Sequence, residues 1–226
     1  MTSVFDKPSY NSKAYPHRYR GTIVVGTIAG GTPTDPKVAE GWLRTKLADK
    51  DDLIREAVAE VMVDRGVTAD EAATIVDANK HLNGFKRDAN GLYIEGRQLK
   101  ACIKEAASIR WPNERWGPTK KGTRSFFPEH VFVVEDRLPL GVTQPTGVAQ
   151  RFVHTWRGNG IQYEEYVEDA KVEFTVITDY AFKAEEWALL WLTAEQQGLG
   201  ASRSQGYGRF EVVQWSRATP EPEQVA

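Results

Sequence analysis

The chain has 226 residues, with 29 Lys and Arg, 31 Asp and Glu, and a formal net charge of −2 at pH 7. This length suits one large domain or one domain with a substantial insertion, and the near-neutral charge excludes a protein covered by basic surface, although it permits a local basic face. The single cysteine, Cys102, excludes an intrachain disulfide and a cysteine-rich metal site. No apolar run approaches the roughly 20 residues that span a bilayer, and no signal-peptide pattern precedes the first strand, so we expect a cytoplasmic protein without membrane contact.

The first third of the chain predicts an arm, a strand and inserted helices. Residues 1–20 mix aromatic, basic and proline residues, which is typical of an N-terminal arm. Residues 21–29 are rich in β-branched side chains and precede Gly30 and Gly31, which predicts a buried strand and a turn. Between residues 35 and 80 the apolar period becomes about 3.6, so two or three helices are expected. The sequence TADE at residues 68–71 is a capping box.

The remainder alternates between strand and helix patterns. Asn90 and Gly91 predict the turn of a hairpin over residues 85–94, and residues 110–128 lack a clean period and predict a loop. Helices are expected at residues 97–109 and 183–197, strands at 130–134, 150–157, 161–168, 170–178 and 209–215, a turn at 158–160, and a disordered tail at 217–226.

Without its insertions, the predicted order is strand, helix, strands, helix, strand. This is the βαββαβ arrangement of a ferredoxin-like (RRM-like) fold, of the α+β class, with two helices on one face of an antiparallel sheet. We therefore expect a single domain over residues 21–216, with insertions at residues 35–80 and 111–147.

A glycine-rich segment, residues 198–208 (GLGASRSQGYG), separates the last predicted helix from the last predicted strand. We call it the glycine-rich loop. Its glycines permit positive φ and a close approach of the backbone to a ligand, and its polar side chains suit phosphate or sugar contacts. A mobile helix-to-strand connection is the alternative interpretation. The candidate nucleic-acid-binding residues of this loop are Ser202, Arg203, Ser204, Gln205, Gly206 and Gly208.

Cations gather in three other segments. Residues 110–127 interleave cations with aromatic rings that could stack on bases or could pack beneath the loop. The predicted helix carries cations at spacings of three and four, and therefore on one face, which could bind phosphates or could be a solvated face. The candidate nucleic-acid-binding residues are Lys120, Lys121 and Arg124 in the predicted loop, Arg97, Lys100 and Lys104 on the helix, and Arg18 and Arg20 in the arm.

The four histidines show no metal-ligand spacing, and neither a phosphate-binding loop nor a paired-carboxylate signature is present. We therefore expect no metal and no cofactor. His154 alternates with Phe152 and Trp156 along a predicted strand, where a packing role is expected.

Two motifs resemble a known family. Residues 90–100 (NGLYIEGRQLK) resemble the "pyIPGSSLKGalR" segment of the RAMP superfamily of CRISPR proteins, and the glycine-rich loop is similar to the C-terminal glycine-rich loop of that superfamily. Glu95 stands where the family usually has proline, and Arg97 and Gln98 stand where it usually has serines. The resemblance covers residues 20–30 and 84–215, and it implies a palm with helical fingers at residues 35–80 and a thumb within residues 111–147.

The resemblance is strongest to the backbone subunits that polymerise along guide RNA, which implies RNA, copies of itself and other effector subunits as partners. It also implies alternatives. A RAMP-type endoribonuclease could use His17 or His81 as a general base. Asp35 lies where some backbone subunits carry a target-cleaving aspartate, although it also suits an ordinary helix start. A structural protein-interaction module without nucleic acid is the third possibility, and we expect a binding protein rather than an enzyme.

Overall fold

The structure is a computed structural model that describes residues 13–33, 59, 62–63, 66–71, 82–155 and 158–218. The chain forms two compact units. The first unit comprises residues 1–28, 87–144 and 168–226, and the second comprises residues 29–86 and 145–167. The insertion expected at residues 35–80 therefore belongs to the second unit, whereas both framework helices belong to the first.

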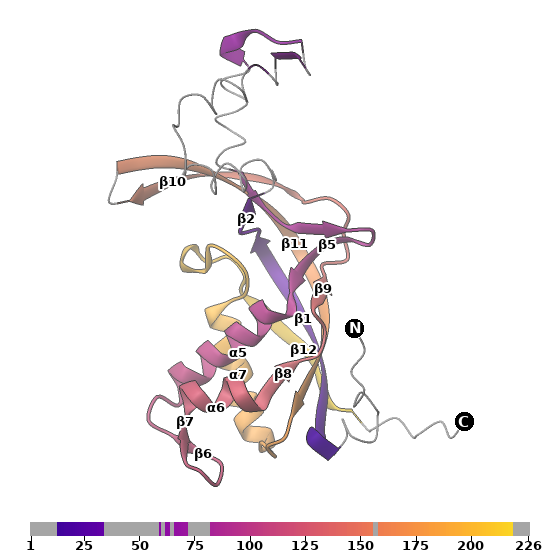
Figure 1. The fold of residues 1–226 in the computed structure, drawn as a ribbon, viewed down its shortest axis with the longest axis vertical. Helices are drawn as coiled ribbons and strands as arrows, with labels where there is room; N and C mark the ends of the chain where they lie inside the picture. Colours follow the sequence, from indigo (N-terminus) through magenta and orange to yellow (C-terminus); the bar gives the residue numbers. More distant parts are fainter. Residues whose placement is uncertain are drawn as a thin grey trace, which may run out of the picture. The chain divides into compact units, whose positions relative to one another are not determined.

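Six elements of the first unit build its frame (Figure 1). In chain order they are β1 (His17–Ala29), α5 (Gly96–Arg110), β8 (Val131–Val133), the second half of β11 (Gly158–Thr178), α7 (Ala184–Gln197) and β12 (Phe210–Arg217). Across the sheet the order is β12-β1-β11-β8, with β12 antiparallel to β1 and β8 antiparallel to β11. The predicted α+β class and the ferredoxin-like βαββαβ frame are confirmed.

Strand β1 begins four residues earlier than the sequence predicts. Tyr19 pairs with Arg217 of β12, and its side chain is only 8% exposed. Its ring stacks on Trp215 of β12 with centroids 5.1 Å apart and contacts Trp187 of α7 at the same distance. Because burial of an aromatic ring is strongly favourable, residues 17–20 join the sheet instead of forming part of an arm.

Helices α5 and α7 pack against each other, and each agrees with its predicted range to within one residue at either end. The N-terminus of α5 is closed by a hydrogen bond from the Glu95 N–H to Oε1 of Gln98 (3.2 Å), a capping contact that the sequence analysis did not recognise. The buried faces consist of Leu99, Cys102, Ile103, Ala106 and Ala107 on α5, and of Trp187, Leu190, Trp191 and Ala194 on α7.

The segment after α5 is not the loop that we expected. It forms a two-stranded ribbon, β6 (Arg115–Trp116) with β7 (Lys121–Gly122), followed by α6 (Thr123–His130). Helix α6 packs on α5. Hydrophobic periodicity does not reveal this order, because the strands are only two residues long and the segment contains prolines.

The predicted hairpin at residues 85–94 is confirmed. Strands β4 (Lys86–Asp88) and β5 (Gly91–Glu95) flank a turn at residues 89–90, and β5 also pairs with β9 (Arg137–Pro139). The Asn90 N–H donates to Oδ1 of Asp88 at 2.9 Å, as expected for an aspartate before a turn.

The second unit contains a long hairpin. Strand β10 (Gly147–Thr155) pairs antiparallel with residues 158–166 of β11. Thr155 faces Gly158, and residues 158–160, where we predicted the turn, belong to strand β11. Glycine occurs in both turns and strands, which is why Gly158 and Gly160 wrongly indicated a turn at this position. Strand β11 also continues past Asp169, although two separate strands were expected there. Asp169 itself has a φ of +52°.

Two short strands complete the described part of the second unit, β2 (Thr32–Pro33) and β3 (Leu82–Gly84), and β3 runs parallel to β11. The capping box is confirmed, since the Thr68 N–H donates to Oε2 of Glu71 at 3.0 Å and the Glu71 N–H donates to Oγ1 of Thr68 at 3.4 Å. Residues 59, 62, 63 and 69–71 are helical, and the rest of the predicted helical insertion lies outside the described residues.

Candidate nucleic-acid interface

The glycine-rich loop is anchored by backbone hydrogen bonds at its closed end. The Leu199 N–H donates to the Gly208 carbonyl at 2.8 Å, and the Gly208 N–H donates to the Thr27 carbonyl of β1 at 2.7 Å. Between these anchors, residues 203–205 form a single 3₁₀ turn that the Gly206 N–H closes by donating to the Arg203 carbonyl at 2.9 Å. The loop is therefore an ordered feature of the palm, in contrast to the mobile connection that was the alternative.

Two glycines of this loop have different roles. Gly208 has a φ of +77°, and a β-carbon there would lie 1.8 Å from the Leu199 carbonyl oxygen. Gly206 has a φ of +91°, but a β-carbon there would meet nothing within 4 Å. We expected the N–H groups of both glycines to face phosphates. Both are instead engaged within the protein, so a ligand has access to the side chains of this loop but not to these two amides.

Arg203 joins the loop to helix α5. Its Nη1 lies 2.6 Å from Oε2 of Glu105, and the two side chains are 35% and 42% exposed. Ser204 and Gln205 are exposed beside it, and Ser202 is half-buried. The ion pair thus brings the loop against helix α5 at Glu105. Glu105 follows Lys104 in the sequence and therefore points about 100° around the helix from it, beside the basic face and not on it.

The three cations of α5 lie away from its buried face, as predicted, but they differ in exposure and in whether another side chain already contacts them. Arg97 is 77% exposed and pairs with Oε2 of Glu95 at 2.5 Å. Lys100 is half-buried, its Nζ lies 4.0 Å from the ring centroid of Phe132 on β8, and burial lowers the pKa of this lysine. Lys104 is exposed. It is therefore the α5 cation that can neutralise a phosphate at the lowest cost.

Three rings of β6 and α6 pack inside the protein. Trp116, Phe126 and Phe127 are at most 6% exposed. The indole Nε1 of Trp116 donates to Oγ1 of Thr123 at 2.9 Å, and that hydroxyl donates to the Trp111 carbonyl at 2.6 Å. Of the two interpretations of these rings, packing is correct for these three and base stacking is not, because their faces are covered by one another.

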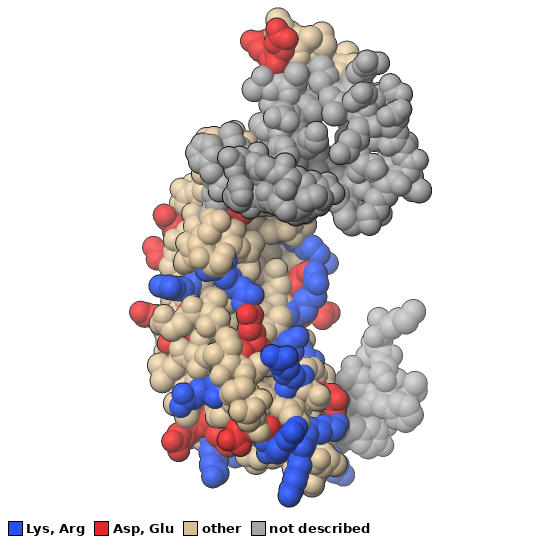
Figure 2. Space-filling view, turned by 90° about the vertical axis from the view of Figure 1, so that its left-hand side faces the viewer, with Lys and Arg blue, Asp and Glu red and all other residues tan. Residues whose placement is uncertain are grey.

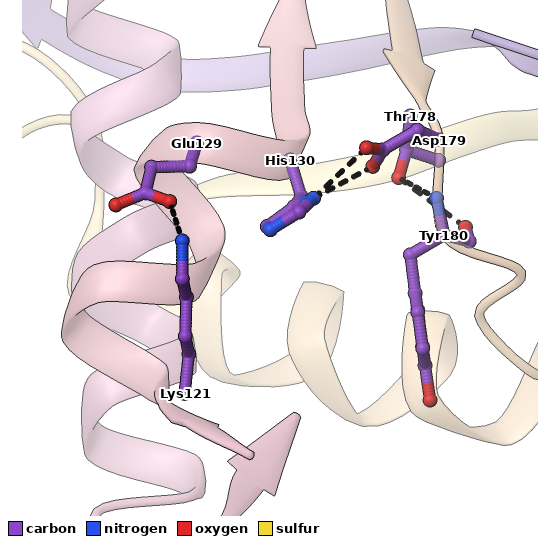
Figure 3. A network of polar contacts seen from close by, with 6 residues as sticks. All are labelled: Lys121, Glu129, His130, Thr178, Asp179 and Tyr180. Carbon is purple, nitrogen blue, oxygen red and sulfur yellow. Dashed lines mark hydrogen bonds and ion pairs between the residues drawn. The ribbon is translucent and has the colours of Figure 1, made fainter. Parts of the chain in front are cut away.

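The cations of the same segment remain at the surface. Lys120 and Arg124 are exposed, and Lys121 forms an ion pair with Glu129 of α6 (Figure 3). Sequence reasoning did not single out Arg110 and Arg115, which are exposed as well. Their signal was available in the charge count, because residues 96–124 contain eight Lys and Arg and only two Glu.

This local excess of positive charge is not apparent from the formal net charge of the whole chain, which is −2. Five of these cations have no carboxylate partner within the described part of the chain: Lys104, Arg110, Arg115, Lys120 and Arg124. Figure 2 shows Lys and Arg in several groups on one face of the molecule, with Asp and Glu among them. The surface is therefore a set of separate cationic points, which suits contacts with successive phosphates.

Arg18 and Arg20 lie on β1, and both are exposed. Side chains alternate along a strand, so both point to the face of the sheet opposite Tyr19 and the helices. No contact among the described residues joins them to the glycine-rich loop or to the basic face of α5.

Of the candidate catalytic residues, His17 lies within the described part of the chain. Nδ1 of His17 accepts a hydrogen bond from Nη2 of Arg217 at 3.0 Å, and partial burial, together with the Arg217 charge, lowers the pKa of this histidine. Asp35 and His81 lie outside the described residues. Sequence reasoning missed the pair in Figure 3, in which Nδ1 of His130 lies 2.9 Å from both carboxylate oxygens of Asp179.

Within the described ranges, no three His, Cys, Asp or Glu side chains gather closely enough to hold a metal ion. None of the helices that the structure describes combines the length and the apolar character needed to cross a membrane.

Comparison with known proteins identifies the fold. A chain in the cryo-EM structure of the Type III-B Cmr-beta bound to cognate target RNA is similar to this chain, with a TM-score of 0.50 and 11% sequence identity. The two chains share a fold. The alignment covers 90% of this chain and 61% of that chain, so this protein spans about three fifths of the length of its structural neighbour. No protein-family model matches the sequence, and no curated protein matches it.

The likeness to the Cmr-beta chain is one of fold, and it agrees with the two motifs on which the RAMP resemblance rests. Both motifs occupy the first unit, where residues 90–100 include strand β5 and the start of α5, and the glycine-rich loop links α7 to β12. The fold thus places both motifs around the same pair of helices, α5 and α7.

Proposed function

We propose that this protein binds RNA as a backbone subunit that oligomerises along a guide RNA in a CRISPR-type ribonucleoprotein complex. The observation that carries the proposal is the ion pair between Arg203 and Glu105, which joins the glycine-rich loop to α5, the helix that carries Lys104. Hydroxyl and amide groups of the loop and the exposed Lys104 are thereby presented together on one RAMP-type frame.

The proposed mechanism is electrostatic and geometric. Lys104, Lys120 and Arg124 neutralise phosphates, while Ser204 and Gln205 hydrogen-bond to phosphate or ribose oxygens. The loop is already ordered by its own hydrogen bonds, so little conformational entropy is lost when it binds. Recognition of the backbone in this way is independent of base sequence, as a subunit repeated along a guide RNA requires.

Oligomerisation is the second part of the proposal. It is supported by the RAMP-type motifs and by the fold shared with the Cmr-beta chain. Light scattering should show assemblies whose mass grows with RNA length. A monomer that stays monomeric at every RNA ratio would remove this part and leave simple RNA binding.

Filter binding with a 40-nucleotide single-stranded RNA across a salt series tests RNA binding itself. Lys104→Ala should weaken binding and reduce the salt slope by about 0.7, because one phosphate contact to a single strand is lost. Lys171→Ala is the matched control, since this lysine is exposed on β11 and pairs with Glu173 at 2.9 Å. Equal effects of both substitutions would show that only net charge matters.

RNA cleavage is the second candidate function, and the His130–Asp179 pair favours it. A carboxylate that accepts a hydrogen bond from Nδ1–H holds the imidazole in the tautomer whose Nε2 is free to act as a general base. Gel analysis of the bound RNA detects this outcome. Shortening of the RNA that disappears in His130→Ala, in His17→Ala or in Asp35→Ala would identify the group responsible. No affinity for RNA in any condition would favour the protein-interaction module.

A further inference from the structure

In the proposed RNA site, the guanidinium of Arg203 is already paired with a carboxylate of the protein, that of Glu105. The Nη1–Oε2 distance of 2.6 Å is at the short end of the range for charge-assisted hydrogen bonds. A carboxylate and a phosphate ester offer similar oxygen pairs to a guanidinium. Glu105 therefore occupies the position on Arg203 that an RNA phosphate would take.

The geometry allows this carboxylate to leave. Glu105 is 42% exposed, so its side chain can turn into water without becoming a buried unpaired charge. Arg203 lies in a turn whose backbone is closed by the Gly206 N–H and anchored through Gly208 to Thr27. The loop thus keeps its backbone hydrogen bonds whether or not the ion pair is present, and Arg203 stays near α5.

We propose that Glu105 is a specificity-determining residue that competes with phosphate for Arg203. This inference rests on the proposed RNA binding. A phosphate that is free in solution must displace the carboxylate unaided. A phosphate within a strand already held by Lys104 and its neighbouring cations is present at a high local concentration, and displaces it readily. The site therefore accepts long RNA and rejects mononucleotides and inorganic phosphate.

Glu105→Gln provides the test, because glutamine keeps the size of the side chain and an oxygen acceptor but removes the charge. Binding of a 20-nucleotide poly(U) RNA should tighten by about five-fold, the effect of removing one like charge at contact distance in water. Binding of uridine monophosphate should tighten by a larger factor, since it lacks other contacts. In an Arg203→Ala background, Glu105→Gln should have no such effect on either ligand.

The matched control is Glu114→Gln, which removes an exposed carboxylate from the same basic segment. It should change neither affinity by the factor seen for Glu105→Gln. Thermal melts run in parallel separate the possible outcomes. Unchanged or weaker RNA binding in Glu105→Gln, with a lower melting temperature, would show that Glu105 only fastens the loop, and would overturn the inference alone. Absence of RNA binding by the wild-type protein and by Glu105→Gln would overturn the proposed function as well.

Discussion

The N–H of Gly208 donates a 2.7 Å hydrogen bond to the carbonyl oxygen of Thr27, so the end of the glycine-rich loop is fastened to the first strand. The neighbouring residues strengthen the contact, because the Gly26 N–H donates to the Arg209 carbonyl at 3.2 Å. A loop tied to the sheet in this way presents its side chains in a defined position, and the glycine at this point has a structural role.

Gly208→Ala should lower the free energy of unfolding by at least about 2 kcal/mol, because its β-carbon would overlap the Leu199 carbonyl and its φ is positive. Gly206→Ala should cost only roughly 1 kcal/mol, since its β-carbon meets open space and only the positive φ remains. Urea denaturation measures both. Equal losses would show that the loop closes differently from the hydrogen bonds described here.

Tyr19→Ala should destabilise the protein by about 3 kcal/mol or more, because a buried ring between Trp215 and Trp187 is removed. Tyr15→Ala is the control. Tyr15 is half-buried and makes one ring contact, with Phe132, so about 1 kcal/mol or less is expected. Thermal unfolding distinguishes the two. A small effect of Tyr19→Ala would indicate that residues 17–20 belong to the N-terminal arm, as the sequence predicted.

Trp116→Phe should lower the melting temperature while leaving RNA affinity unchanged, because this ring is buried and cannot stack on a base. Thr123→Val should be destabilising by about 1 to 3 kcal/mol, since it leaves the buried indole N–H of Trp116 without its acceptor. Filter binding and thermal melts of both variants provide the measurement. A loss of affinity without a loss of stability in Trp116→Phe would restore the stacking interpretation.

Cys102 should resist thiol reagents in the native state. Burial raises the pKa of its thiol to about 12, and its Sγ lies 3.9 Å from the Ala194 carbonyl of α7. Because the folded pKa is above the unfolded value of 9.0, stability is unaffected below that pH and falls as the pH rises toward 12. Ellman's reagent at pH 8 should label the protein only in denaturant. Rapid labelling of the folded protein would contradict this burial.

Local patterns in the sequence were sufficient for several elements. The ranges of α5 and α7, the hairpin whose turn includes Asn90, and the capping contact of Thr68 and Glu71 all follow from interactions within a few residues. The basic face of α5 follows from helical spacing for the same reason. Such features depend on neighbours in the chain, so they can be predicted from one sequence.

Other features were decided by contacts between residues far apart in the chain. Tyr19 belongs to the sheet because Trp187 and Trp215 cover it, and Arg203 meets Glu105 because the loop folds back to α5. The rings after α5 are buried because they pack on one another. The sequence by itself determined the two framework helices, the hairpin that precedes α5 and the presence of cations. Only the tertiary structure decided which aromatic rings are hidden and which cations are already paired, because both depend on partners that no local pattern contains.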